Sequence, residues 1–392
     1  MSGLLIRNSF LLTKTEPTYG EAVTLANTDA MRIVSLEVNP ITGTRVPRNI
    51  IKGFLGADRQ PLASDHVEVT ITFEWGGSGV AATAPRFSPL LLASGFNLTA
   101  SAEITGTAAA GGAGTITLDS SASAVDGTYV GFPIRITSGT GNTHAGVITA
   151  YVGSTKIATV VPTTPTFVPA ASSQYLIAAL SMYQPISTFG ANSSCTLVAV
   201  KDQNVHRIEG FRGSPALNAP LNQYGLMTIT GMGRYVTPTA RSTEAFSYGG
   251  QSEPLPITPK HTRALRFQGY APCTEAFSFD WSLTTTFRAL VGCTERALIT
   301  DRANPNGSIT IENPLISDKN FFTSAADNTG ASDGPFVVQH GTEATKSSIF
   351  IAPKAAISGD LSFSDSESID MLTIPYTALP TVSNDETRLI FW

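Results

Sequence analysis

A glycine- and threonine-rich stretch has the residue types that hold phosphate in nucleotide-binding loops: residues 135–148 read RITSGTGNTHAGVI. A Walker-type loop is GxxxxGK[ST], but Val147 and Ile148 follow Gly146 where that pattern needs lysine and serine or threonine. The pattern GxGxxG fails too, because His144 stands at its third glycine. Both loops also need a helix after them, whereas VITAYVGSTKIATV reads as two strands. We therefore predict a loop between strands.

The sequence has no pattern typical of metal binding or of an activated nucleophile. No histidine lies in an HxH or HExxH pattern or near a cysteine at ligand spacing; the five are His66, His144, His206, His261 and His340. No GxSxG elbow singles out a serine. A loose acidic cluster lacks the glycine and final glutamate of a calcium loop and reads as a solvated β-turn; its members are Asp360, Asp365, Glu367 and Asp370. We expect no enzyme activity, no cofactor and no metal.

Composition favours many short strands. Only 14% of the 392 residues are charged, and there are 34 glycines and 24 prolines, a mixture that suits turns between strands and breaks long helices. The net charge of −5 comes without any run of lysine or arginine, which argues against a protein that grips nucleic acid. We expect no membrane anchor and no signal peptide. The three widely spaced cysteines predict reduced, mostly buried thiols.

Alternating and β-branched runs bounded by turn residues predict a mainly β fold. The strand-like runs are Arg32–Val38, Val67–Phe73, Cys195–Val200, Leu226–Thr230, Ser308–Glu312 and Ser348–Ile351. Two short helices are predicted, one within Pro85–Phe96 that starts near Ser88 and one within Ser317–Asp327 that Ser317 or Asp318 would cap.

The order of these predicted elements occurs twice along the chain, which suggests an internal duplication. We expect two tandem β-sandwich or barrel domains, each with a short helix. The boundaries predicted from composition are residues 1–102 with 176–238 for the first domain, 103–175 for a small inserted β module, 239–260 for a linker rich in Pro, Ser and Gly, and 261–392 for the second domain.

Several stretches, in the same order, resemble the tail tube proteins of long-tailed (siphovirus-type) bacteriophages. The N-terminal KTEPTYGEAVTLANTDAMRIVSLEVNP is similar to the family's K-x-E-x-x-Y-G segment and its first strand. The later motifs RNIIKGFLGADRQPLASDHVEVTITFEWGGSG, VHRIEGFRGS, GLMTITGMGRYVTPT, ALITDRANPNGSITIENP and SDSESIDMLTIPYTALP continue the resemblance. It covers most of residues 5–102 and 180–392. Residues 103–175 instead resemble a small module of assorted phage virion proteins.

The resemblance implies a structural virion protein whose rings stack into the phage tail tube, the conduit for DNA ejection. Two tube domains per chain would make a trimer a pseudo-sixfold ring, and a hexamer is the alternative. The implied partners are other copies of the chain, the tape measure and terminator proteins, and DNA that passes without specific binding. The protein would be assembled in the bacterial cytoplasm and reside in the virion tail. We expect the module on the tube exterior, where a glycan or a neighbouring subunit is the first ligand to seek.

Two long loops, Thr42–Ser64 and Phe287–Pro305, are predicted to contact stacked rings or neighbouring subunits through basic residues that meet acidic patches. The six residues are Arg45, Arg48, Lys52, Arg59, Arg288 and Arg302. The alternative is that these charges are only solvated.

A rival hypothesis is a β-sandwich carbohydrate-binding or adhesion protein of a virion or cell surface, with Trp75, Trp281 or surface tyrosines as sugar platforms. A hydrolase with scattered catalytic residues is a third.

Overall fold

The computed structural model describes residues 5, 7–48, 50–188, 193–249, 251–342 and 345–392. The chain is mainly β, as predicted, with two short α-helices in the described residues, α1 (Ser88–Ala93) and α2 (Phe321–Ala325). A short 3-10 turn, η1, covers Asn27–Asp29. No helix in the described part of the chain is long and apolar enough to cross a membrane.

The main sheet contains a first strand set built from residues 35–235. Its members are β3 (Ser35–Arg45), β4 (Leu62–Glu74), β14 (Cys195–Lys201), β15 (Asn204–Pro220) and β16 (Leu226–Tyr235). They pair antiparallel in the order β3–β4–β16–β15–β14.

A second strand set follows the same order of elements. Its members are β19 (Thr274–Asp280), β22 (Asn306–Glu312), β23 (Gly334–His340), β24 (Ser348–Ile357), β25 (Ser362–Ser366) and β26 (Ile369–Ala378). β19 pairs antiparallel with β22, and β22 pairs antiparallel with β26. The other edge of β26 pairs with β25 along residues 369–373 and with the end of β24 along residues 376–378. β23 pairs with β24, as β14 does with β15.

One antiparallel contact joins the two sets into a single run of strands. The last residues of β15, Ala216–Pro220, pair with Asp280–Ala276 of β19. The run is therefore β3–β4–β16–β15–β19–β22–β26–β25, eight strands in which each neighbour is antiparallel.

The remaining strands of the main sheet flank this run. They are β1 (Ser9–Thr15), β2 (Ala30–Met31), β5 (Phe96–Ser101), β13 (Leu180–Pro185), β17 (Thr239–Ala240), β18 (Thr262–Phe267) and β27 (Arg388–Phe391). β1 pairs with β14, and β13 pairs with both β5 and β27. β27 also pairs with β24, so β5 and β13 are joined through it to the second strand set.

The core lies on one face of the eight-strand run because apolar side chains alternate with polar ones along each strand. In β4 the inward residues Val67, Val69, Ile71 and Phe73 are all buried. Phe277 and Phe279 of β19 join the same core, and α1 packs on it. The sequence alternation predicted in these strands is thus the pattern of burial.

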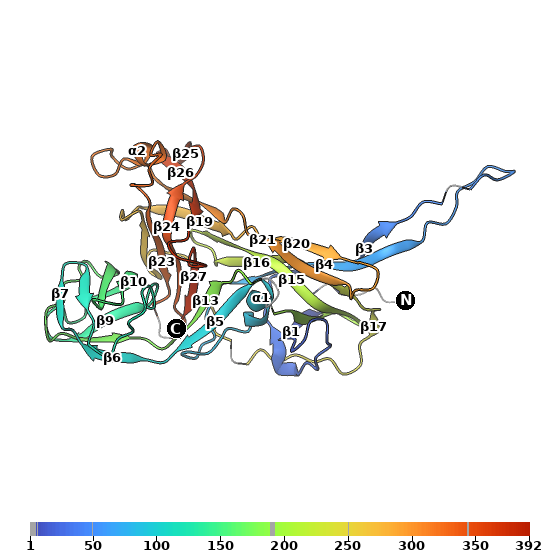
Figure 1. Cartoon of the computed structure of the whole chain (residues 1–392), viewed down its shortest axis with the longest axis horizontal. Coiled ribbons are helices and arrows are strands. Elements are labelled where there is room, and N and C mark those ends of the chain that lie inside the picture. The colour runs from blue at the N-terminus through green and yellow to red at the C-terminus, as the bar shows by residue number, and fades with distance from the viewer. Residues whose placement is uncertain (1–4, 6, 49, 189–192, 250, 343–344) are drawn as a thin grey trace.

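Two hairpins extend the run at one end of its strands. The first, which we call the arm, is formed by the outer parts of β3 and β4 and by residues 46–48 and 50–61, and it projects far from the body of the molecule (Figure 1). The second pairs β20 (Thr284–Arg288) with β21 (Arg296–Asp301). It lies back over the first strand set, where Phe287 stacks on His66 of β4 with ring centroids 5.0 Å apart.

Residues 104–177 form a separate seven-stranded sheet, which we call the module. Its strands are β6 (Ile104–Thr107), β7 (Ala110–Gly112), β8 (Thr115–Thr117), β9 (Pro133–Ser138), β10 (Ala145–Val152), β11 (Ile157–Pro162) and β12 (Gln174–Ile177), in the order β6–β12–β9–β10–β11–β8–β7. The chain enters and leaves the module at adjacent points, because Ser101 of β5 pairs with Leu180 of β13.

The module does not stand free of the main sheet. Its core includes Val337, Ile349, Ile351 and Ile390 of the main sheet. The guanidinium of Arg388 also donates to the carbonyls of Gly127 and Val130 at 3.0 and 2.7 Å. The module therefore covers an apolar patch of the main sheet.

Residues 139–144 are a turn between β9 and β10, as predicted, with Gly139 and Gly141 at positive φ. The cap of α2 was predicted wrongly, because the side chain of Asn320 accepts from the Thr323 NH. The prediction that the cysteines are mostly buried was wrong, since Cys273 and Cys293 are exposed and only Cys195 is buried; all three are free thiols. Arg32–Val34 lie outside β3, which begins at Ser35.

Candidate functional site

The face of the eight-strand run opposite the core is hydroxyl-rich and acidic. We call it the polar face and define it by the outward residues Glu37, Asn39, Glu68, Thr70, Thr72, Ala216, Asn218, Thr228, Thr230, Ser278, Asp280, Asn306, Ser308, Thr310, Thr373 and Pro375. It contains three carboxylates and no lysine or arginine. Two hollows of about 240 and 410 Å³ lie along it.

Hydroxyl pairs cross the polar face from strand to strand. Thr72 lies 3.1 Å from Thr228 and Thr70 lies 3.3 Å from Thr230, oxygen to oxygen. In the second strand set the matching contacts are Ser278 to Ser308 at 2.9 Å and Thr310 to Thr373 at 3.0 Å. Cross-strand hydroxyl pairs satisfy one another's hydrogen bonds, so this face holds short, uncharged side chains in fixed positions.

The arginines nearest the polar face are held by other contacts. Arg212 of β15 is 5% exposed, and its guanidinium donates to the Ala297 carbonyl at 3.2 Å and lies 4.9 Å from the centre of the Tyr19 ring. Arg234 of β16 donates to the Gly20 carbonyl at 3.1 Å. The residues that define the polar face therefore carry negative charge only, and Arg234, on the same side of β16 as Thr230, adds a cation that is 37% exposed beyond them.

The two ends of the run are sheet edges. In the described residues β3 pairs only with β4, and β25 pairs only with β26. An edge strand presents unpaired NH and C=O groups to any further strand. Both edges therefore offer the backbone hydrogen bonds needed to add another chain.

Four of the six basic residues predicted from the sequence meet in the arm. Arg48 and Arg59 are exposed, Arg45 donates to the Gln60 carbonyl at 3.3 Å, and Lys52 pairs with Asp58. Arg288 is exposed at the end of β20, in the other hairpin. The first predicted loop is shorter than Thr42–Ser64, because β3 runs to Arg45 and β4 starts at Leu62.

The structure places Arg302 in a contact within its own chain. Its guanidinium pairs with the Glu386 carboxylate at 2.5 Å, with side chains only 11% and 5% exposed. It also donates to the Ile186 carbonyl at 3.1 Å. Arg302 fixes the end of β21 against the body of the protein, where its guanidinium is occupied by contacts within the chain.

An acidic cleft lies at the end of the strands opposite the arm. It has a volume of about 650 Å³ and is lined by the start of β19, the end of β22 and the β25–β26 turn. Its lining includes Glu275, Glu312 and Glu367 and no basic residue. Glu367 belongs to the two-residue β25–β26 turn, so the predicted β-turn is confirmed.

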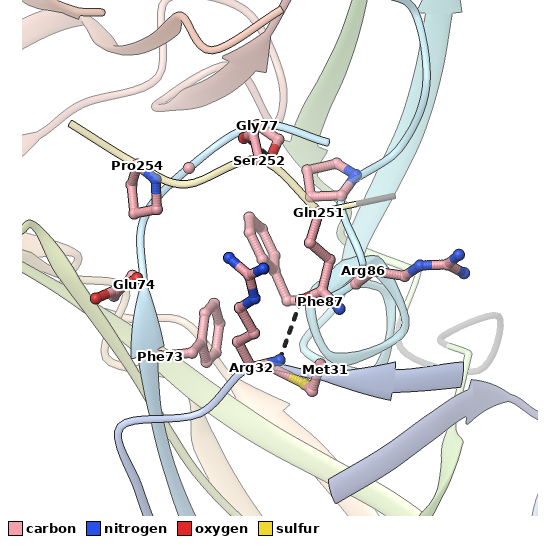
Figure 2. A pocket seen from close by; sticks show the side chains of 12 residues that line it. Met31, Arg32, Phe73, Glu74, Gly77, Arg86, Phe87, Gln251, Ser252 and Pro254 are labelled. Carbon is pink, nitrogen blue, oxygen red and sulfur yellow. Dashed lines mark hydrogen bonds between the residues drawn. The ribbon is translucent and has the colours of Figure 1, made fainter. Parts of the chain in front are cut away.

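A cavity of about 40 Å³, shown in Figure 2, marks where the predicted linker crosses the first strand set. Gln251 accepts from the Arg32 NH at 3.0 Å and donates to the Ala30 carbonyl, and Ser252 donates to the Gly77 carbonyl at 2.6 Å. The cavity has room for a few water molecules only. Here the linker is a strap bound along the body.

The tryptophans named in the carbohydrate-binding hypothesis cannot be sugar platforms. Trp75 and Trp281 are 1% and 0% exposed. The indole NH of Trp281 donates to the Thr387 hydroxyl at 2.8 Å inside the core. This finding removes both tryptophans from that hypothesis and leaves it the surface tyrosines, such as Tyr224, which is 47% exposed.

Sequence reasoning missed the polar face and the acidic cleft. The signal for the face was present, since every second residue of Val67–Phe73 and Leu226–Thr230 is apolar and the residues between them include paired threonines. No local signal predicted the cleft, because its three glutamates come from three separate segments. No protein-family model and no curated protein matches this chain.

Proposed function

We propose that this chain is a structural protein whose copies close into rings and stack into a tube, as in the phage tails that its sequence resembles. The observation that carries the proposal is the internal contact between β15 and β19. It joins the end of one strand set to the start of the next. The corresponding strands at the two ends of the run, β25 and β3, each keep one free edge in the described residues.

The direction of the strands supports closure. Neighbours alternate along all eight positions, so β3 and β25 run in opposite directions. A β25 edge can therefore pair antiparallel with the β3 edge of the next copy. Closing a sheet on itself removes the edges that would otherwise aggregate.

The internal contact also gives a register for this joint. The chain pairs Ala216 with Asp280 and Asn218 with Ser278. In the two strand sets, β3 and β4 correspond to β19 and β22, and β15 and β16 correspond to β25 and β26. Aligned by their strand registers, Asn218 of the first set corresponds to Ser364 of the second, and Glu37 corresponds to Ser278. A joint with this register would bring Ser364 opposite Glu37 of the next copy, with both side chains on the polar face.

The preferred ring is a trimer. We interpret the two strand sets as a tandem duplication, so three chains would supply six sets in one barrel of 3 × 8 = 24 strands. A hexamer is the alternative. The polar face would line the lumen, where carboxylates and hydroxyls without lysine or arginine would let DNA pass and not retain it. The tape measure and terminator proteins of the tail would be further partners.

Cryo-electron microscopy of the purified protein tests the proposal. Hollow tubes with three chains per ring and the polar face on the lumen are the expected result. Six chains per ring would refute the trimer, and a monomer that never polymerises and binds a glycan array would refute the tube and favour an adhesion protein.

A further inference from the structure

The arm has the chemical character of an insertion element. It carries four basic residues and one acidic residue between Arg45 and Arg59. Its tip also exposes large apolar side chains, which normally seek a partner surface; their exposed fractions are 48% for Ile50, 101% for Ile51, 71% for Phe54 and 102% for Leu55.

The acidic cleft has the complementary character. Glu275, Glu312 and Glu367 line it and are exposed, and none of them forms an ion pair with a described residue. Apolar side chains line it as well, among them Met371 and Ile369, which is 48% exposed. An apolar surface whose carboxylates form no ion pair with a described residue matches an apolar tip with surplus arginines.

The two surfaces lie at opposite ends of the same strands. β3 leaves the body toward the arm, whereas β15, β22 and β25 end at the cleft. Figure 1 shows the arm at one extremity of the molecule and β25 with α2 at another. One chain cannot fill its own cleft in this arrangement, but a second copy placed end to end can.

The arm is long enough for such a contact. Sixteen residues, 46–61, lie beyond the last β3–β4 pair of Arg45 with Leu62. A hairpin of this length reaches roughly 25 Å at about 3.3 Å per residue. That reach exceeds the depth of a side-chain layer and allows the tip to enter a neighbouring molecule.

We propose that the arm tip of one copy docks in the acidic cleft of a copy in the next ring, with Arg48 and Arg59 facing Glu275 and Glu312. This inference rests on the proposed tube and adds the site of axial contact. The contact is head to tail: each copy uses two different surfaces, so the assembly is open-ended and grows as a filament. It also makes stacking dependent on salt, because the paired charges lie at the surface.

The native cysteines allow a direct test. Cys273 is exposed and lines the cleft, and Cys293 is exposed in the β20–β21 hairpin. In a Cys293→Ser background, single cysteines are introduced at Ile51, Phe54 and Leu55, and assembled tubes are treated with a short flexible bismaleimide. Because desolvation and the Glu312 carboxylate raise the pKa of Cys273, the reaction is run at mildly alkaline pH.

The expected product is a ladder of covalent oligomers that extends beyond three chains and disappears when Cys273 is replaced by serine. A ladder that stops at three chains would place the arm on a neighbour within one ring and overturn the proposal. Normal tubes without any Cys273-dependent product at all three positions would overturn it as well. Failure of the unmodified protein to form tubes would instead refute the proposed function.

Charge reversal supplies the second measurement. The variant R48E/R59E and the variant E275K/E312K should each leave rings intact but lower the fraction of protein that sediments as tubes at least tenfold. Mixed in one solution, the two variants should recover mixed tubes, because each supplies the complement of the other. If both variants polymerise as the parent does, the arm and the cleft are not partners.

Discussion

The hydroxyl of Tyr19 accepts a hydrogen bond of 2.6 Å from the backbone NH of Ala297. This bond ties the N-terminal segment to β21, nearly 280 residues later in the chain. The Tyr19 ring also covers the Arg212 guanidinium and fits against Gly210, where any Cβ would meet the ring at 2.6 Å. The K-x-E-x-x-Y-G segment is thus a clamp between distant parts of the fold.

The glutamate of the same segment, Glu16, is buried and accepts four hydrogen bonds. The donors are the NH groups of Gly20 and Gly210, both at 2.8 Å, and the hydroxyls of Ser194 and Thr196 at 2.5 and 2.8 Å. A buried carboxylate is tolerated when its oxygens are satisfied in this way. The motif therefore has a structural role in this chain.

Tyr19→Phe should destabilise the protein. Ala297 is fully buried, so its NH would lose its acceptor without gaining water, at a cost of about 1–3 kcal/mol in the free energy of unfolding. Denaturant unfolding measures the change. Tyr224→Phe is the matched control, because Tyr224 is 47% exposed and should change stability by less than about 0.5 kcal/mol. Equal effects for the two variants would contradict the clamp.

The double variant E37C/S364C should form a disulfide between chains. In the proposed joint, which repeats the register of the β15–β19 contact, these residues would lie opposite each other, within the distance that a disulfide needs. On a non-reducing gel we expect a closed covalent trimer. E37C/F363C is the control, because neighbouring residues of a strand point to opposite faces. Equal cross-linking of the control would show that the register is wrong.

A lysine on the polar face should make the tube retain DNA. Ser278→Lys adds one cation per chain beside Ser308, on a face whose defining residues carry only negative charge. Phosphate contacts release counterions, so retention of short DNA should appear at low salt and fall linearly on a log–log plot as salt rises. Val152→Lys, at an exposed site of the module, is the control. Retention by the control alone would place the lumen elsewhere.

Stability should fall in mild acid because of His340. Its Nε2 donates to the Leu255 carbonyl at 2.9 Å, and its Nδ1 can accept from the Thr262 hydroxyl at 3.2 Å. Burial lowers the pKa of His340 below its usual value. The imidazole of His340 is therefore protonated more readily in the unfolded chain than in the folded protein. Its contribution to the free energy of unfolding is full above about pH 6.5 and declines as the pH falls toward the folded pKa.

Melting temperatures between pH 5 and 8 test this expectation. His340→Gln should lower stability at pH 8 and flatten the decline below pH 6.5. Part of the slope should remain, since burial also lowers the pKa of His206. An unchanged slope in the His340 variant would assign the acid sensitivity to other groups.

The strand pattern was predictable because it is local. Alternation in Val67–Phe73 decides which side chains face the core, and the structure buries Val67, Val69, Ile71 and Phe73 accordingly. The turn at residues 139–144 was predictable for the same reason, since its glycines occupy backbone conformations with positive φ. The basic residues of the arm were recognised from the sequence. Their contacts within the chain, such as that between Lys52 and Asp58, were not predicted.

By itself, the sequence determined the mainly β class, the repeated order of elements and the alternation that separates a polar face from a core. Tertiary structure alone decided that β15 pairs with β19, that Glu386 binds Arg302, and that three distant glutamates share one cleft. The reason is physical. Alternation and turns depend on residues a few positions apart, whereas pairing between distant strands depends on how the whole core packs.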